Sequence, residues 1–318
     1  MRILPALAAS FFLAAGFTLN PAGARGEAGL TAAPILNRPV GARSSGMGRA
    51  FTAVPGDAES VMYNPAGLAF ATGLKAHVSY MNGFGGGAYG FAAVPVKAGN
   101  FVLTPAFLYY NSGTMRLNLS DGTSGDVTAE LDTVSMLSAA CKPLPDLAVG
   151  ATLKRTAMEL AETASASGLH FDFGALYAPT KSLSLGAAAL NNGGAVKFEE
   201  KGDPAPATLR AGFSYKVVIN PPNLLDRSAD ISYFDIVIAS DWSRVVKEKG
   251  YFQSGLEMNM KMPNSLFLSL RAGYLFNRPE EGFTFGFGLK SGRWDFGFGF
   301  EAAKKLDSRR PVSLSYEF

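Results

Sequence analysis

From residue 74 to the end of the chain, hydrophobic side chains recur at every second position. In Phe283–Lys290, Phe and Leu alternate with Thr, Gly and Lys, and in Trp294–Glu301, Trp and Phe alternate with Asp, Gly and Glu. This period of two is typical of strands with one apolar and one polar face. Because only Ser291-Gly292-Arg293 separates the two segments, we predict an antiparallel hairpin.

Segments of this kind number about fourteen, and most have the roughly 9–12 residues that cross a bilayer at a tilt. Short turns alternate with longer polar connections such as 112–126 and 192–207, as they do in outer-membrane barrels. One connection, 218–230, is long although it falls on the short-turn side. We therefore predict an all-β fold, a transmembrane antiparallel β-barrel of about 14 strands over residues 74–318. The expected strands are 74–82, 86–97, 100–111, 127–142, 146–160, 167–178, 181–191, 208–217, 231–243, 250–261, 265–276, 282–290, 293–302 and 311–318.

The last eight residues, Pro311–Phe318, alternate in the same way and end on an aromatic side chain. An open sheet edge inside a bilayer leaves unpaired backbone groups that cost several kcal/mol each. The last strand is therefore expected to pair with the first one, near Lys75–Asn82. With an even number of strands, this arrangement would place both termini of the chain on the periplasmic side.

Composition supports export and a membrane sheet. Residues 1–24 have the features of a cleaved signal peptide, namely Arg2, the apolar stretch Ile3–Leu19 and the small residues Ala22-Gly23-Ala24. The 36 glycines and 24 phenylalanines suit a sheet with one lipid-facing and one crowded face. Cys141 is the only cysteine, so no intrachain disulfide is expected. The net charge of +3 gives no argument for nucleic acid. We predict the bacterial outer membrane as the location.

The segment before the barrel does not alternate. Gly, Ala and Ser dominate residues 41–73, Asp57 could begin a short helix, and Asn64-Pro65 predicts a turn. A compact, small-residue piece fits the limited space inside a barrel. We therefore predict that residues 25–73 form a small N-terminal luminal plug, or hatch.

Three motifs of this segment carry a family resemblance. Ser45-Gly-Met-Gly-Arg-Ala-Phe51, Asp57-Ala58 and Tyr63-Asn-Pro-Ala-Gly-Leu68 together resemble the start of FadL-type outer-membrane transport proteins, and most closely the PorV/PorQ-like members. The resemblance extends to Arg271-Ala-Gly-Tyr274 and to the C-terminal strand. It implies a fourteen-stranded barrel with an N-terminal hatch. The chain lacks the long extracellular insertions with which the fatty-acid transporters capture their ligand.

The resemblance also implies site residues. Gly46, Gly48, Asn64, Pro65 and Ala66 are the predicted ligand-binding or gating residues of the hatch. The alternative is that these small residues serve only to fold the segment tightly.

The C-terminal strand resembles the signal that the bacterial barrel-assembly machinery recognises. The resemblance implies that Tyr316 and Phe318 form this signal.

An enzymatic alternative rests on His77 and His170, which fall on the polar phase of their strands near Ser79 and Asp172. Outer-membrane hydrolases use such residues, but half of every barrel strand must be polar toward the lumen. The sequence contains no Ser-centred nucleophile motif, zinc-ligand spacing or phosphate loop. We predict a non-enzymatic protein with no cofactor and no metal.

The sequence leaves two main candidate functions, and a hydrolase is a distant third. The FadL resemblance implies passage of small hydrophobic molecules across the outer membrane. The PorV/PorQ resemblance implies a docking or shuttle component of a type IX-like protein secretion system. The expected partners are outer-membrane lipids, the barrel-assembly machinery, and either a hydrophobic small molecule or a secreted protein, with no nucleic acid.

Overall fold

The computed structural model describes residues 30–83, 86–118, 122–198, 202–219, 233–262, 266–305 and 307–318. The predicted signal peptide, residues 1–24, lies outside the described residues, as does most of the long connection 218–230. Within the described ranges, no helix is both long and apolar enough to cross a membrane.

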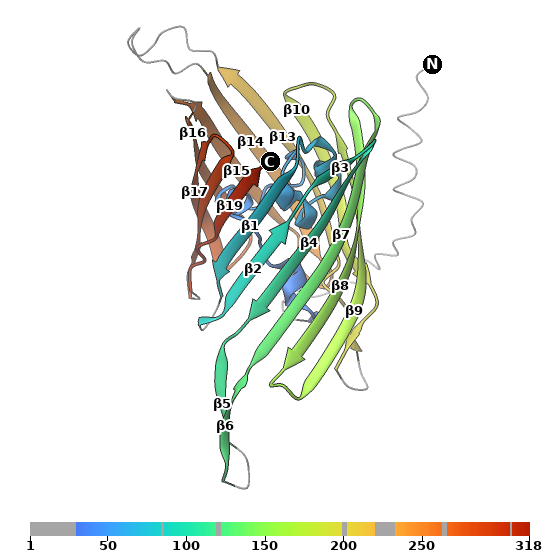
Figure 1. Cartoon of the computed structure of the whole chain (residues 1–318), viewed down its shortest axis with the longest axis vertical. Coiled ribbons are helices and arrows are strands. Elements are labelled where there is room, and N and C mark those ends of the chain that lie inside the picture. Colours follow the sequence, from blue (N-terminus) through green and yellow to red (C-terminus); the bar gives the residue numbers. More distant parts are fainter. Residues whose placement is uncertain are drawn as a thin grey trace.

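The strands form one closed antiparallel sheet (Figure 1). β1 (Lys75–Asn82) pairs with β19 (Val312–Glu317), with Val78 opposite Leu314, so the predicted closure is confirmed. β2 (Ala88–Ala93) and β3 (Val96–Ala98) both pair with β4 (Phe101–Asn111) and are two parts of one strand. The break between them falls at Val94-Pro95, where proline has no N–H to donate.

With β2 and β3 counted as one, fourteen strands close the barrel, as the alternation predicted. The strand spans agree with the predicted ranges to within a few residues. The remaining strands are β7 (Glu130–Leu144), β8 (Leu147–Leu160), β9 (Ala164–Tyr177), β10 (Leu183–Gly193), β13 (Thr208–Ile219), β14 (Tyr233–Val245), β15 (Tyr251–Lys261), β16 (Leu266–Leu275), β17 (Glu281–Ser291) and β18 (Trp294–Ala303).

The two ends of the barrel differ. At the short-turn end, tight connections join β7 to β8 and β17 to β18, and the C-terminus lies there (Figure 1). At the long-loop end, the connection from β4 to β7 contains a two-stranded hairpin, β5 (Thr114–Asn118) and β6 (Ser124–Thr128), that extends beyond the barrel. A second short hairpin, β11 (Val196–Lys197) with β12 (Gly202–Asp203), follows β10. Short turns mark the periplasmic end of such barrels and long loops the extracellular end.

Large apolar side chains cover the outer face of the barrel, and aromatic ones lie near both ends of the strands. Toward the long-loop end these are Tyr80, Tyr109, Phe252, Tyr274 and Phe283, and toward the short-turn end Phe101, Tyr177, Tyr215, Trp294 and Phe318, all exposed. An apolar band between two aromatic girdles is the lipid-facing surface of an outer-membrane barrel. The outer membrane is therefore the environment that this surface fits.

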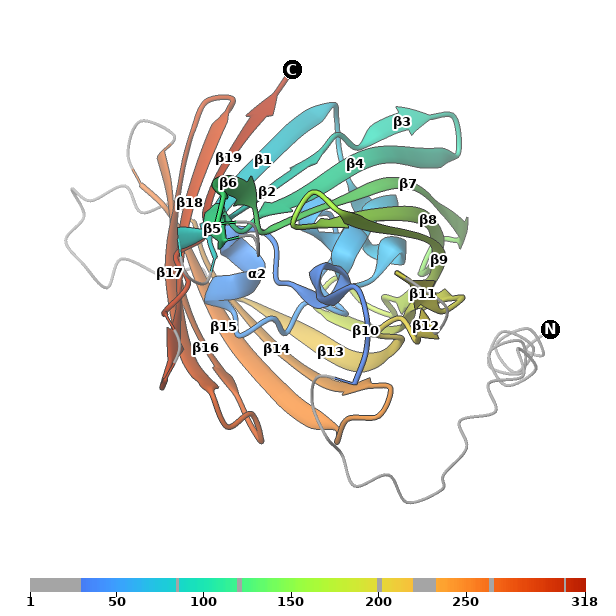
Figure 2. The ribbon, with the colours of Figure 1, turned by 90° about the horizontal axis from the view of Figure 1, so that it is seen from below.

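Residues 33–71, here called the inner segment, contain four short helices: η1 (Pro34–Asn37), α2 (Ala42–Gly46), η2 (Ala58–Met62) and η3 (Pro65–Phe70). Figure 2 shows them within the ring of strands. Most of their side chains are buried. α2 contacts β16 to β19, whereas η3 contacts β4, β7, β8 and β9.

Candidate functional site

Buried polar side chains on the inner faces of β13 to β19, here called the polar wall, bind the inner segment. Oδ2 of Asp241 accepts hydrogen bonds from the backbone N–H of Phe51 at 2.8 Å and of Thr52 at 2.9 Å, and from Oγ1 of Thr52 at 2.6 Å. Arg210 donates to the same oxygen at 3.0 Å and to the carbonyl of Arg49 at 2.7 Å. These charge-assisted bonds offset the cost of burying the Asp241 carboxylate.

Two arginines of the inner segment form ion pairs with the polar wall. Arg43 binds Glu257 in bidentate fashion, at 2.7 and 2.8 Å, and Asp57 at 3.0 Å. Arg49 pairs with Glu281 at 2.9 Å and with Glu301. Bidentate pairs fix orientation as well as charge, so α2 and the turn after it are held in one position on this wall.

Gly46 and Gly48, two of the predicted gating residues, lie at the end of α2 against β15, β16 and β17. Oγ1 of Thr284 donates to the carbonyl of Gly46 at 3.1 Å and accepts from the N–H of Gly48 at 3.0 Å. Gly48 has a φ of +62°, and a Cβ there would lie 2.8 Å from the carbonyl oxygen of Ser254 and the nitrogen of Tyr274. Glycine is thus required for this close approach.

Asn64, Pro65 and Ala66, the other predicted site residues, begin η3. Oδ1 of Asn64 accepts from the N–H of Ala66 at 3.1 Å, and its Nδ2 donates to the carbonyls of Thr52 at 2.7 Å and Ala175 at 3.0 Å. Pro65 occupies the first helical position, where its fixed φ is favourable. These residues fold the inner segment and attach it to β9, away from Gly46 and Gly48. A role of either group in gating stays a prediction.

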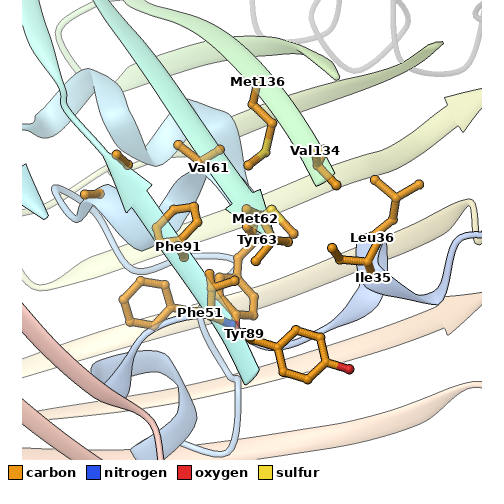
Figure 3. Packing of buried hydrophobic residues seen from close by; sticks show 14 of the residues in the cluster. Ile35, Leu36, Phe51, Val61, Met62, Tyr63, Tyr89, Phe91, Val134 and Met136 are labelled. Atoms are coloured by element: carbon orange, nitrogen blue, oxygen red, sulfur yellow. Dashed lines mark hydrogen bonds between the residues drawn. The ribbon is translucent and has the colours of Figure 1, made fainter. Parts of the chain in front are cut away.

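Apolar contacts dominate the other side of the inner segment. The inner faces of β1, β2, β4 and β7, here called the apolar wall, share one buried cluster with η1, η2 and η3 (Figure 3). Val61 and Met62 of the inner segment belong to this cluster with Phe91, Val134 and Met136 of the wall. Figure 3 shows these side chains directed toward one another. Such contacts have no directional requirement.

A cavity of about 330 Å³, here called the mouth pocket, lies at the long-loop end between the inner segment and the apolar wall. The rings of Tyr89 and Tyr110 stack with their centroids 4.3 Å apart, and the Arg38 guanidinium lies 5.7 Å from the centre of the Tyr89 ring. Sequence reasoning missed this site. The pocket is lined by Pro34, Ile35, Arg38, Gly83, Tyr89, Tyr110, Glu130, Asp132, Asp307 and Arg309.

A second cavity of about 330 Å³, here called the vestibule, lies at the short-turn end. Its lining is mainly charged, and Arg43 and Asp57 of the inner segment are part of it. The inner segment therefore contributes residues to a cavity at each end of the barrel. The wall residues of the vestibule are Lys75, Lys216, Asp235, Glu257, Asn259, Phe267, Ser269, Arg271, Lys290 and Asp295.

Two acids of the inner segment differ in their electrostatics. Burial, and then the nearby Asp57 carboxylate, raise the pKa of Glu59 to about 7, although it accepts from the N–H of Ser44 at 2.8 Å. Burial also disfavours the Asp57 carboxylate, but Arg43, with smaller contributions from Lys75 and His77, lowers its pKa to about 2. Asp57 is thus the ionised partner of Arg43 across the neutral range, whereas Glu59 titrates within it.

The residues of the hydrolase alternative are not brought together. Nδ1 of His77, on β1, lies 2.9 Å from Oγ of Ser315, whereas Nε2 of His170, on β9, lies 3.2 Å from Oγ1 of Thr156. β2, β4, β7 and β8 separate β1 from β9 in the sheet. Asp172 forms an ion pair with Lys154 at 2.7 Å, and Ser79 lies opposite Phe91 and Ser313. The histidines are therefore partners in separate luminal contacts.

No protein-family model and no curated protein matches the chain. Solved structures do match. The chain is similar to the Ralstonia pickettii toluene transporter TbuX, with 14% identity, a TM-score of 0.60, and coverage of 87% of this chain and 98% of that one. The CymD monoaromatic hydrocarbon channel has 13% identity, a TM-score of 0.58, and coverage of 88% and 98%.

A Pseudomonas aeruginosa FadL homologue also matches, with 13% identity, a TM-score of 0.50, and coverage of 88% and 98%. At these identities the likeness shows a shared fold, and it confirms the predicted outer-membrane barrel architecture. These neighbours are transporters and channels rather than enzymes. The PorV/PorQ assignment stays a prediction.

Proposed function

We propose that the protein moves small hydrophobic molecules across the outer membrane, through the barrel and past the inner segment. The observation that carries this proposal is the position of the inner segment in a lipid-facing barrel, with the mouth pocket at one end and the vestibule at the other. The description of TbuX as a toluene transporter and of CymD as a monoaromatic hydrocarbon channel supports the class of solute.

In this proposal residues 25–73 act as the plug, and passage requires a movement of the inner segment. Ion pairs and hydrogen bonds hold it to the polar wall, whereas nonpolar side chains make most of its contacts with the apolar wall, beside one polar contact of 3.9 Å between Nε2 of His77 and Oε1 of Glu59. A hydrophobic solute can replace apolar contacts but cannot replace the partners of buried charges. We therefore infer that the inner segment stays on the polar wall, with Gly46 and Gly48 at its anchor, and that the solute passes along the apolar wall.

The C-terminal residues have a separate role in this proposal. Phe318 is 64% exposed, and its N–H donates to the carbonyl of Leu74 at 3.0 Å. Tyr316 and Phe318 lie with ring centroids 5.0 Å apart on the closing strand. This exposure supports recognition by the barrel-assembly machinery before the barrel closes. No feature of the described residues favours the alternative of docking secreted proteins.

The proposal is tested by uptake and by permeability. Cells that lack FadL-type proteins should take up radiolabelled toluene several-fold faster when they express this chain than with an empty vector. In proteoliposomes, the full chain should exclude a disaccharide, whereas a variant without residues 41–68 should admit it in a swelling assay. Toluene uptake equal to that of the vector would contradict the transport function. Equal disaccharide exclusion by both proteins would contradict the plug.

A further inference from the structure

The mouth pocket contains a buried acid that no N–H or hydroxyl group of the described residues contacts. Asp132, on β7, is 1% exposed and lines the pocket, yet neither of its carboxyl oxygens accepts a hydrogen bond from an N–H or hydroxyl group of the described residues. The carboxyl of its neighbour Glu130 lies within hydrogen-bond reach, but two carboxyls can share a hydrogen bond only when one of them holds a proton. Arg38 lies over the ring of Tyr89, and it interacts with Asp132 through its charge and not through a hydrogen bond within the described residues. A buried carboxyl normally has hydrogen-bond donors, so the absence of N–H and hydroxyl donors here requires an explanation.

Other buried acids of the barrel interior show what Asp132 lacks. Asp241 accepts four hydrogen bonds at one oxygen, and Glu257 accepts from Arg43 and Arg271. Glu301 accepts from Arg49 and Arg309. Asp132 differs from these acids in that it lines a cavity next to aromatic rings. A donor for its oxygens can therefore come from a molecule in the pocket.

Three residues of the mouth pocket form a row across neighbouring strands. Tyr89 of β2 lies opposite Tyr110 of β4, and Tyr110 lies opposite Asp132 of β7. Neighbouring strands are about 4.8 Å apart, so the row spans roughly 10 Å, the length of one substituted aromatic ring with its contacts. Tyr89 and Tyr110 supply aromatic surface, and Ile35 adds apolar surface from the inner segment.

We propose that the mouth pocket binds single-ring aromatic molecules that carry a hydroxyl group, with the ring against the two tyrosines and the hydroxyl donating to Asp132. This inference rests on the proposed function and specifies its substrate class. Aromatic carboxylates are disfavoured because Glu130, Asp132 and Asp307 are all acidic. Of the two basic residues, Arg309 is already paired with Glu281 at 2.8 Å and with Glu301 at 3.0 Å.

The test compares three ligands that differ in one substituent: 4-methylphenol, toluene and 4-methylbenzoate. Binding to the full chain in lipid nanodiscs is measured by calorimetry, with empty nanodiscs subtracted. We expect 4-methylphenol to bind at least tenfold more tightly than 4-methylbenzoate. Asp132→Ala should weaken 4-methylphenol binding at least tenfold and leave toluene binding unchanged. Because no N–H or hydroxyl donor would be left without Asp132, this variant should fold, as checked by heat-modifiable migration on gels.

Asp126→Ala is the matched control, because it removes the same charge from the β5–β6 hairpin, outside the pocket lining. It should leave the affinities of all three ligands unchanged. Equal 4-methylphenol affinity in the wild type and Asp132→Ala would overturn the inference, whatever the toluene uptake. Failure of toluene uptake in cells would instead overturn the transport function, and the binding result separates the two outcomes.

Discussion

On the polar wall, Asp241, Glu257 and Glu301 each bind donors of the inner segment through specific atoms, whereas on the apolar wall Phe91 and Met136 only pack against it. Moving the inner segment away from the polar wall therefore has a different energetic cost from moving it away from the apolar wall. Leaving one partner of a buried ion pair alone costs about 3–5 kcal/mol, whereas each exposed methylene costs about 0.8 kcal/mol. The loss of one ion pair costs a large amount of free energy at once, whereas the loss of apolar contact costs a small amount for each exposed group. We therefore expect the inner segment to stay attached at the polar wall, which acts as a hinge, and the solute to pass along the apolar wall.

The largest effect is expected from Asp241→Ala on the polar wall. The change leaves Arg210 and the N–H groups of Phe51 and Thr52 without their acceptor, so the free energy of unfolding should fall by about 3–5 kcal/mol. Guanidinium unfolding in detergent, followed by tryptophan fluorescence, measures it. Asp241→Asn retains an acceptor oxygen, so its free energy of unfolding should fall by less. A loss in Asp241→Ala no greater than in Asp241→Asn would show that the carboxylate does not anchor the inner segment.

A second test addresses the close approach at Gly48. Gly48→Ala adds a Cβ that overlaps the backbone of Ser254 and Tyr274 and imposes a left-handed φ on alanine, for a loss of about 2–4 kcal/mol. Gly99→Ala is the control, because Gly99 has a φ of +61° but nothing within 4 Å of the added atom. Its loss should be about 1–2 kcal/mol by the same unfolding measurement. Equal losses of unfolding free energy in the two variants would mean that β15 and β16 can shift to make room for the added Cβ.

The smallest effect is expected where the inner segment packs against the apolar wall. Val61 is fully buried in the shared cluster, and Val61→Ala removes two methyl groups, for a loss of about 2 kcal/mol. The same variant should raise toluene uptake, because the contact between the inner segment and this wall is weaker. A fall in uptake, or a stability loss larger than that of Asp241→Ala, would reverse the assignment of hinge and passage.

The sequence predicted the barrel well because each wall residue faces either lipid or lumen, and this alternation is local. The predicted strand 100–111 is Phe101–Asn111 in the structure, and the predicted strand 282–290 is Glu281–Ser291. Local breaks were harder to predict. The register shift between β9 and β10 at Leu190 and Asn191, and the β5–β6 hairpin within the connection 112–126, depend on neighbouring strands rather than on the pattern of one segment.

The site was less predictable for the same reason. The small residues around Gly48 could be singled out from the sequence, since a close approach requires glycine wherever the partner lies, but their role in gating stays a prediction. Asp132 was missed because one acid on the luminal phase of a strand resembles any other. Its lack of N–H and hydroxyl donors becomes visible only when Tyr89 and Tyr110 are in place beside it. The anchors Asp241 and Glu257 contact residues roughly two hundred positions earlier, which no local pattern reveals.

The attachment of α2 to the last strands determines the order in which the chain can fold. The N–H of Ala42 donates to Oγ of Ser313, 271 residues later, and Arg49 binds Glu301, 252 residues later. Contacts between such distant residues form late, since closing the intervening chain costs entropy before any contact repays it. We therefore expect the inner segment, which precedes every strand of the barrel in the sequence, to reach its native position only after the final strands have formed.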